Sequence, residues 1–311
     1  MRIVRLPEIQ KALPLSEVIA AMRDAVVAQA RGECDTPMPM HLSVGGAESE
    51  VHIKSSYRRG GSFWALKAAG SFPQRAGRGL SPGTGCILLC DAATGDPAAL
   101  FLDEGWMTDA RTAAVAAMTA ASLGRRDRVL GILGSGTQAR LQARLHAEVL
   151  PLERVLLWGR SPDRAAACRD EIAAALPNLD VRVAGSPAEV AATARLVIAA
   201  TASRAPLLSA ADVRPGTLVE AVGSDSAGKQ ELDPEILRRA ALLLVDSRAQ
   251  CEKLGELQHA RSETGRAVEL GAYAADPRPP APDAVVVADF TGLGVEDLAI
   301  AELAFRRLAP E

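Results

Sequence analysis

From residue 126 onwards, short runs of aliphatic residues alternate with alanine-rich stretches of helical periodicity. The runs are VLGIL, RVLLW, VRVA, RLVIAAT, TLVEAVG, ALLLVD and AVVVADF, and each has the length and composition of a buried strand. Strands that alternate with helices pair in parallel, because each helix carries the chain back across a face of the sheet. The pattern therefore predicts an α/β fold with a Rossmann-type, doubly wound parallel sheet.

The first part of the chain has a different texture. Helical periodicity predicts one helix over residues 15–31, capped by Ser16, and a second helix from about Thr108 to Leu123, capped by Thr108. Between residues 51 and 101, the runs VHIKSSY, SFWALKAAG, GCILLC and AALFLDEG are separated by turn residues rather than by helices. This spacing predicts a hairpin-rich sheet.

Composition and charge limit the classes of function. A chain of 311 residues has room for two domains, and a net charge of −3 provides no basic excess for binding nucleic acid or an anionic membrane. No apolar run approaches the length of a membrane span, and the start MRIVRLPEIQKAL has no secretory h-region, so we expect a cytoplasmic protein. The five cysteines form no disulfide framework and the four histidines show no ligand spacing, so we expect no metal site.

A glycine-rich loop, GSGTQA at residues 134–139, joins the first of the later strands to a helix and matches the pattern G-x-G-x-x-A. Gly134 would make the tight turn, Gly136 would let the backbone approach a pyrophosphate, and Ala139 would let the helix pack closely on the strand. The phosphates would then lie on the N–H groups of the helix N-terminus. A purely structural turn is the alternative, but the strand before the loop and the helix after it favour dinucleotide binding.

The end of the next strand, in VLLWGRSPDR, bears on which nicotinamide cofactor is bound. Proteins that bind NAD usually place Asp or Glu here, where it accepts a hydrogen bond from the ribose 2′-hydroxyl. This chain has Gly159, Arg160 and Ser161 instead, and an arginine beside a serine suits a 2′-phosphate. A solvated loop arginine is the alternative. The sequence therefore favours NADP(H) over NAD(H).

Isolated charges occur in three further segments. Lys67 lies in the apolar run FWALKAAG, and Arg111 lies in the first turn of a predicted helix, where a cation opposes the helix dipole. Asp225 and Lys229 follow the carboxyl end of a strand, where open α/β sheets bind ligands. A cation at the start of a helix is stabilised most when an anion lies beside it.

Each of these charges also has a simpler explanation. Lys67 could extend its ammonium to solvent, and Asp225 could cap a turn. Arg111 could pair with Asp109 or Glu104 on its own segment. Taken one at a time, the charged residues do not decide between a binding site and ordinary ion pairing.

The combination of segments is more specific than any one of them. FWALKAAGSFPQ is followed by GLSPGTGCILLCDAATGDPAALFLDEGWMTDARTAA, then by GILGSGTQARLQ and EAVGSDSAGKQELDPEIL. Together they resemble the ornithine cyclodeaminase/μ-crystallin family. The resemblance implies hydride transfer between nicotinamide C4 and the α-carbon of an amino acid or its imine, and a homodimer. It also implies an α+β substrate-binding and dimerisation domain over residues 1–125, completed by residues 292–311, around a Rossmann domain over residues 126–291.

The resemblance also assigns roles to single residues. It implies that Lys67 and Arg111 bind the substrate carboxylate, that Thr291 contacts the substrate, and that Asp225 is the general acid/base or orients the amine. Two cations would fix an α-imino acid and draw electrons from its imine carbon. The cofactor-binding residues implied by the motifs and the resemblance are Thr84, Arg111, Gly134, Gly136, Thr137, Gln138, Ala139, Arg160, Ser161, Thr201, Val222, Lys229 and Phe290.

Two departures from the family pattern concern the substrate. Cyclodeaminases carry P-x-R-x-H-L, whose arginine binds the carboxylate, whereas this chain has TPMPMHL, with Pro39 in the arginine's place. Ornithine-specific members place a glutamate for the distal ammonium where a gapless count back from Lys67 gives Lys54. A lysine there would repel a diamine and could contact the substrate's second carboxylate or a cofactor phosphate. An exposed strand lysine is the alternative.

The leading hypothesis is therefore an NAD(P)H-dependent ketimine reductase or amino-acid dehydrogenase that acts on a small α-imino or α-amino acid. The alternative is a cyclodeaminase, which recycles bound NAD and releases ammonia. A μ-crystallin-like binding protein without activity is the third hypothesis. Steady consumption of NADPH with a ketimine would distinguish the reductase from the cyclodeaminase.

Overall fold

The computed structural model describes residues 1–45 and 49–308. Contacts divide the chain into two compact units, one formed by residues 1–112 and 293–311 and the other by residues 113–292. The first unit thus contains both ends of the chain, and each unit is described separately below.

The first unit is built on a seven-stranded sheet in the order β1-β7-β6-β5-β4-β2, with β3 paired to β4 off this path. β4 to β7 follow one another as antiparallel hairpins, as the texture of this part of the sequence predicts, and β1 joins β7 in parallel. The strands are β1 (Arg2–Arg5), β2 (Cys34–Asp35), β3 (Met40–Ser43), β4 (Glu50–Arg58), β5 (Phe63–Ser71), β6 (Gly83–Asp91) and β7 (Pro97–Leu102).

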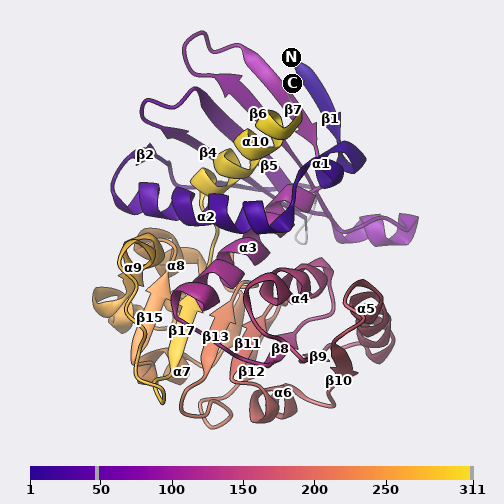
Figure 1. Ribbon diagram of the computed structural model, residues 1–311, viewed down its shortest axis with the longest axis vertical. Coiled ribbons are helices and arrows are strands. Elements are labelled where there is room, and N and C mark those ends of the chain that lie inside the picture. The colour runs from indigo at the N-terminus through magenta and orange to yellow at the C-terminus, as the bar shows by residue number, and fades with distance from the viewer. Residues whose placement is uncertain (46–48, 309–311) are drawn as a thin grey trace. The chain divides into compact units, whose positions relative to one another are not determined.

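One face of this sheet is packed by the last helix, α10 (Gly294–Leu308), which lies over β4, β5 and β6 and against α2 (Leu15–Ala30) (Figure 1). The start of α10 lies so close to β4 that a side chain at Gly294 would collide with the carbonyl group of Ser55. Towards the other end of α10, the Phe305 ring meets the Phe63 ring edge to face, with centroids 5.2 Å apart. A short helix, α1 (Leu6–Ala12), follows β1.

The predicted start of α2 at residue 15 is confirmed, but the predicted cap is wrong. The helix begins at Leu15 with Pro14 as the N-cap residue, so Ser16 lies inside the first turn and does not cap it. Proline is favoured near a helix start because its φ angle is fixed and it lacks an N–H to satisfy. The helix ends at Ala30, one residue before the predicted end, and Gly32, with a φ of 69°, follows the C-cap residue Arg31.

The predicted cap of α3 (Trp106–Ser122) is also wrong, because the helix begins before Thr108. The Asp103 carboxylate accepts a hydrogen bond of 2.8 Å from the backbone N–H of Met107 and so caps the helix start. Arg111 consequently lies in the second turn of α3 rather than in the first. The helix dipole acts mainly within the first turn. In the second turn it opposes a cation only weakly, so the dipole no longer explains why a buried cation is found there.

The second unit contains an eight-stranded sheet in the order β10-β9-β8-β11-β13-β17-β15-β16, in which every described pairing is parallel. This arrangement confirms the predicted Rossmann-type doubly wound sheet, with the strand order reversing direction between β8 and β11. The strands are β8 (Val129–Leu133), β9 (Arg154–Trp158), β10 (Asp180–Val183), β11 (Leu196–Ala199), β13 (Leu218–Ala221), β15 (Leu242–Val245), β16 (Val268–Glu269) and β17 (Val286–Asp289).

Helices and a small second sheet complete this unit. β12 (Arg204–Leu208) and β14 (Gln230–Leu232) form a two-stranded parallel pair that the sequence did not predict. The helices are α4 (Thr137–Val149), α5 (Pro162–Ala175), α6 (Pro187–Thr193), α7 (Pro234–Arg239), α8 (Arg248–Leu254) and α9 (Leu270–Ala275), with the 3₁₀ helices η2 (Glu256–His259) and η3 (Arg261–Arg266). The 3₁₀ helix η1 (Pro73–Arg78) belongs to the first unit.

The parallel sheet is buried on both faces. Consecutive residues of β11, β13 and β17 are all buried, although their side chains point alternately to opposite faces. One face packs against apolar residues of α6 and α7, including Val190 and Ile236. Burial on both faces explains why these strands are continuous apolar runs rather than alternating ones. Among the described residues, no helix is both long and apolar enough to cross a bilayer.

Candidate functional site

The glycine loop follows β8 and leads into α4. Gly134 has a φ of 136°, and a Cβ there would lie 2.5 Å from the carbonyl oxygen of Ala200, so this turn requires glycine. A Cβ on Gly136 would meet no described atom within 4 Å, so the space beside its backbone is open. Gly136 is the N-cap residue of α4, and no described side chain caps this helix. The first N–H groups of α4 are therefore available to an anionic ligand.

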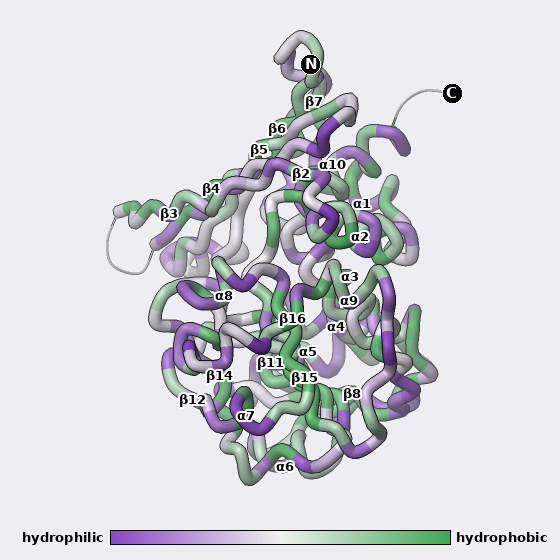
Figure 2. The backbone as a smooth tube through the Cα atoms, turned by 90° about the vertical axis from the view of Figure 1, so that its left-hand side faces the viewer, coloured by the Kyte–Doolittle hydropathy of each residue, from purple (hydrophilic) through white to green (hydrophobic). Residues whose placement is uncertain are grey.

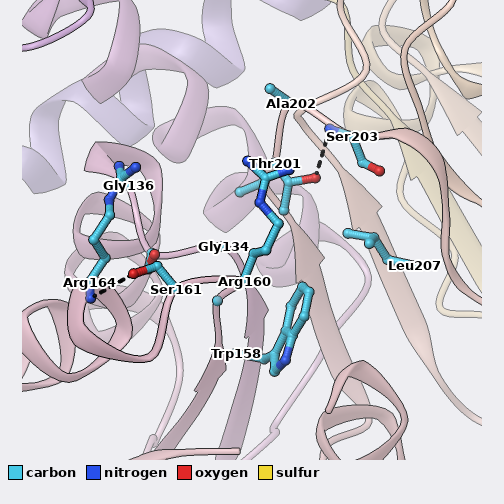
Figure 3. Close-up of a pocket in the computed structure, with 13 residues that line it drawn as sticks. Gly134, Gly136, Trp158, Arg160, Ser161, Arg164, Thr201, Ala202, Ser203 and Leu207 are labelled. Atoms are coloured by element: carbon cyan, nitrogen blue, oxygen red, sulfur yellow. Dashed lines mark hydrogen bonds between the residues drawn. The ribbon is translucent and has the colours of Figure 1, made fainter. Parts of the chain in front are cut away.

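A pocket of about 340 Å³ opens beside this loop (Figure 3). It lies at the point where the strand order reverses, because its walls come from the segments that follow β8, β9 and β11. The lining residues are Gly134, Ser135, Gly136, Trp158, Gly159, Arg160, Ser161, Arg164, Ala200, Thr201, Ala202, Ser203 and Leu207.

Two arginines and no described acidic residue line this pocket. Arg160 and Ser161 lie where the sequence placed a 2′-phosphate site, and Arg164 adds a second cation that the sequence analysis missed (Figure 3). The Ser161 hydroxyl also caps α5, since it accepts a hydrogen bond from the backbone N–H of Arg164. Because Ser161 caps α5, Arg164 lies in the first turn of this helix, next to the same loop, and this capping pattern was the available signal.

A buried carboxylate holds together the loops after β11 and β13. Glu231 accepts hydrogen bonds from the backbone N–H of Thr201 (2.6 Å), from the Thr201 hydroxyl (2.7 Å) and from the backbone N–H of Gly223 (2.9 Å). Burial raises the pKa of Glu231 to about 7, against the effect of these hydrogen bonds. Glu231 thus fixes the position of Thr201 in the pocket wall, a role that the sequence analysis did not foresee.

The other sequence-predicted cofactor residues of this unit lie outside the pocket lining. Thr137, Gln138 and Ala139 form the first turn of α4 directly after the loop. Val222 and Phe290 follow the carboxyl ends of β13 and β17, both buried.

Thr291, predicted to contact the substrate, is buried and engaged with Asp246. Its hydroxyl donates a hydrogen bond of 3.0 Å to the Asp246 carboxylate and accepts one of 2.9 Å from the Gln250 side chain. These contacts attach the segment after β17 to the segment after β15 and give Thr291 a structural role in this unit.

Asp225 and Lys229 lie in the loop between β13 and β14, and they contact each other. The Lys229 ammonium donates a hydrogen bond of 2.6 Å to the Asp225 carboxylate, and the Ser226 hydroxyl donates another, of 3.2 Å. The Asp225 side chain is 44% exposed, whereas that of Lys229 is 16% exposed. The carboxylate is therefore oriented by two donors and still reachable from solvent.

The first unit contains a buried cluster of opposite charges centred on Lys67 and Arg111. The Lys67 ammonium donates a hydrogen bond of 3.0 Å to Asp297, and the Arg111 guanidinium lies 2.8 Å from Glu296 and 3.2 Å from Asp297. Lys67 is 2% exposed and Arg111 4% exposed. The structure thus brings together two cations that are 44 positions apart (111 − 67) on β5 and α3.

The partners of these cations differ from those considered in the sequence. Arg111 pairs with Glu296 and Asp297 at the start of α10, two partners that the simpler explanation did not consider. Lys67 does not extend to solvent. Two adjacent acidic residues in the first turn of an otherwise apolar helix, GVEDLAIAELAF, were the signal that the sequence analysis overlooked.

The charges of this cluster shift one another's protonation. Burial lowers the pKa of Lys67 to about 7; Asp297 opposes this shift, whereas the positive charges of Arg111 and Lys54 add to it. Burial works against ionisation of Asp297, but the charges of Lys67, Arg111 and Lys54 keep its pKa below the usual value. Burial raises the pKa of Asp103. Lys67 therefore gains or loses its proton near neutral pH.

Two further predicted residues lie on the same sheet. Lys54 is 7% exposed and pairs with Lys67 across β4 and β5, so the exposed-lysine alternative is wrong. Thr84 pairs with Gly70 across β5 and β6. Since side chains alternate along a strand, this register places Thr84 on the face opposite to Lys67.

His41, Glu50 and His52 form a cluster that their spacing in the sequence does not reveal. β3 and β4 pair so that His41 faces His52, and the Glu50 carboxylate lies 3.2 Å from His41 and 3.7 Å from His52. Their ligand atoms all lie within 4.8 Å of one another. Histidines on paired strands meet without any local motif, and here the register of β3 and β4 explains their proximity.

The fold and the pocket define a protein with a Rossmann-type unit, which has a pocket beside its glycine loop, and a second unit that carries buried cations. Comparison with known families shows that the chain belongs to the ornithine cyclodeaminase/mu-crystallin family, whose model matches residues 2–310. This match confirms the resemblance seen in the sequence. Family membership makes the chain an enzyme of the reductase, dehydrogenase or cyclodeaminase type.

Two relatives are similar over most of their length. A putative dehydrogenase of Rhizobium meliloti is 34% identical over 316 residues, which cover 99% of this chain and 95% of the relative. The iminosuccinate reductase of Paracoccus denitrificans is 31% identical over 269 residues, covering 84% of this chain and 82% of the relative. Among solved structures, Thermococcus litoralis Delta(1)-pyrroline-2-carboxylate reductase, in complex with NADH and L-proline, superposes with a TM-score of 0.92, at 26% identity, covering 99% of this chain and 97% of that one.

Proposed function

We propose that this chain is an NAD(P)H-dependent reductase of a small α-imino acid. The observation that carries the proposal is the buried pair Lys67 and Arg111, two cations held within one cluster by Glu296 and Asp297. Burying cations is costly unless anions compensate them, and a substrate carboxylate is a further compensating anion. The glycine loop supports the use of NAD(P)H, because the open space beside its backbone suits a pyrophosphate.

The residues divide the chemistry between them. The nicotinamide cofactor, when bound at the glycine loop, supplies the hydride that reduces the imine carbon. Lys67 and Arg111 bind the substrate carboxylate and, by their charge, make the α-carbon more electrophilic. Asp225 holds the protonated nitrogen by charge and hydrogen bond, so that hydride addition leaves a neutral amine. The first unit is therefore assigned to the substrate and the second to the cofactor.

A screen of NADPH oxidation tests this proposal. The substrates are pyruvate, glyoxylate or oxaloacetate with ammonium or methylamine, and preformed cyclic ketimines. A reductase consumes NADPH steadily with at least one of them. A cyclodeaminase instead releases ammonia from ornithine or lysine without net change of the cofactor. Absence of turnover with both panels would refute the assignment.

We further propose that the chain prefers NADP(H). Arg160 and Arg164 both line the pocket, with no acidic residue among its described walls to receive a ribose hydroxyl. Arg160→Ala should weaken NADPH binding about tenfold or more, since a charge-assisted hydrogen bond contributes roughly 1.5–3 kcal/mol, and should leave NADH binding nearly unchanged. Fluorescence titration with both cofactors measures the two dissociation constants. Arg182→Ala, an exposed arginine outside the pocket lining, is the control.

Substrate binding should weaken as pH rises through about 7, where Lys67 loses its proton. Because the pKa of Lys67 is lowered, the ammonium is present below this pH and is lost above it. KM should therefore rise above pH 7 by up to about tenfold per pH unit, the limit for one proton. Lys67→Arg keeps its charge throughout and should remove this rise. An identical pH profile in both proteins would contradict the assignment of the change to Lys67.

We also propose a homodimer formed through the first unit. Four exposed apolar residues alternate along β3 and its flanks, so strand periodicity places them on one face: Met38, Met40, Leu42 and Val44. β3 lies next to β4 (Figure 2). An exposed apolar row of this kind is typical of an interface. Light scattering at micromolar concentration should give a dimer for the wild type and a monomer for Leu42→Glu. A wild-type monomer would contradict the proposal.

A further inference from the structure

β3 and β4 bring two histidines and a glutamate to the same face of their sheet. His41 and His52 are Cα partners in the antiparallel register of the two strands, and their rings meet edge to face with centroids 4.9 Å apart. Residues directly opposite each other in such a pair share one face. Glu50 belongs to that face as well, because it precedes His52 by two residues on β4. Two imidazoles and one carboxylate are therefore held together by the backbone pairing of two strands.

The donor atoms of these three side chains converge. The Nε2 atoms of His41 and His52 lie 3.2 Å and 3.7 Å from the Glu50 carboxylate, and the ligand atoms of all three residues lie within 4.8 Å of one another. A tetrahedral zinc ion with ligands at about 2.0–2.2 Å holds its donor atoms roughly 3.4 Å apart. Small side-chain adjustments, with the strands in place, would therefore bring the three donors to one ion.

Hydrogen bonding to Glu50 is the simpler explanation of the cluster, but it covers only one of the two contacts. The separation of 3.2 Å between His41 and Glu50 is a hydrogen bond, whereas the 3.7 Å between His52 and Glu50 is too long for one. The carboxylate thus does not bond to both imidazoles at once. A cation between the three side chains would contact every donor.

The ligand set indicates which cations fit. Imidazole and carboxylate together are typical ligands of Zn²⁺ and similar transition-metal ions, whereas Mg²⁺ and Ca²⁺ prefer oxygen ligands alone. The side chains of His41, Glu50 and His52 are 46%, 21% and 15% exposed, so an ion from solvent can reach them. Three protein ligands leave the fourth position of a tetrahedral ion to water.

β3 is a strand for which such a cross-link matters. All four of its residues are exposed, and it pairs with β4 off the main path of the sheet. Apolar burial therefore contributes little to its attachment within one copy of the chain. Met40 and Leu42 lie on the face opposite to His41, so an ion bound by His41 leaves the proposed dimer interface uncovered.

We propose that His41, Glu50 and His52 bind a divalent transition-metal ion of the Zn²⁺ type, which fastens β3 to β4. The expectation of no metal site came from the spacing of histidines along the sequence, and this site is formed instead by two paired strands. The proposal is independent of the proposed reductase, because neither substrate nor cofactor takes part in metal binding.

Calorimetric titration of the metal-free, full-length protein with Zn²⁺ tests the site. The wild type should bind one Zn²⁺ per chain with a dissociation constant of about 10 µM or lower. His41→Ala and Glu50→Gln should each weaken binding about 100-fold or more, since loss of even an indirect partner of a metal ligand costs about 10–100-fold. His259→Ala, which removes a histidine from the second unit, is the matched control and should bind Zn²⁺ like the wild type. Mg²⁺ in excess should not compete.

Amide hydrogen exchange tests whether the ion fastens β3. Saturating Zn²⁺ should slow exchange in residues 40–43 and 50–53 of the wild type about tenfold or more and leave β8 unchanged. The effect should be absent in His41→Ala, a change at a side chain that is 46% exposed and therefore compatible with folding. A wild type without saturable Zn²⁺ binding, or equal affinity in the wild type and in both cluster variants, would overturn the proposal.

Discussion

Asp225→Asn should lower kcat by about 10² to 10⁴, the range over which a general acid or base contributes to catalysis. The amide keeps the shape of the side chain and can still accept a hydrogen bond from Lys229, which lies 2.6 Å from the carboxylate in the wild type. What is lost is the negative charge that is proposed to lie beside the substrate nitrogen, whose own charge changes as hydride arrives. KM should change little, because the substrate carboxylate is proposed to be bound by Lys67 and Arg111.

The kinetic split identifies the role of Asp225. Cofactor affinity should stay within about twofold in Asp225→Asn, since the pyrophosphate is proposed to lie at the glycine loop, residues 134–139. Glu148→Gln removes one charge from an exposed position of α4 and should have no effect on kcat. Wild-type turnover in Asp225→Asn would remove this residue from the mechanism. A large loss of cofactor affinity would indicate that the loop between β13 and β14 had been displaced.

The parallel sheet and its glycine loop were predictable because their determinants are local. A strand buried on both faces is a continuous apolar run, and each such run is followed by its own turn and helix. Gly134 and Gly136 could be assigned different roles from the pattern alone. The structure shows the tight turn at Gly134, which has a positive φ and a crowded Cβ position, and shows open space beside Gly136.

The partners of the buried charges were not predictable because they are distant in the sequence. Glu296 lies 185 positions from Arg111, and Asp297 lies 230 positions from Lys67. No periodicity or motif connects such pairs before the fold is known. The same holds for Glu231, which joins the loops after two different strands. The prediction from local sequence also failed at the start of α3, where either Asp103 or Thr108 could cap the helix. Asp103 caps it, so the helix begins before Thr108.

Histidines 41 and 52 show the same limit on a smaller scale. They face each other because β3 and β4 pair in one register, and a shift by one residue would place them on opposite faces. The register depends on the apolar pattern of the whole sheet. Spacing within a single segment therefore cannot reveal this cluster.

Arg111→Met should lower the free energy of unfolding by about 3–5 kcal/mol, the usual effect of removing one partner from a buried ion pair. The guanidinium lies 2.8 Å from Glu296 and 3.2 Å from Asp297, and all three side chains are at most 5% exposed. The substitution therefore removes the cation that lies between two buried carboxylates. Urea unfolding followed by circular dichroism measures this change, and KM for the imino acid should rise at least about tenfold in the same protein.

A second variant separates the structural role of Arg111 from its role in binding. Glu296→Gln in the Arg111→Met background removes one of the two carboxylates left behind, so it should recover a large part of the lost stability. It supplies no cation, so KM should stay as high as in Arg111→Met. Arg111→Lys should keep a charge at this position but lose the planar, two-sided contact with Glu296 and Asp297. Its stability should therefore lie between that of the wild type and that of Arg111→Met. Recovery of a wild-type KM together with stability in the double variant would show that Arg111 only supports the fold and does not bind the substrate.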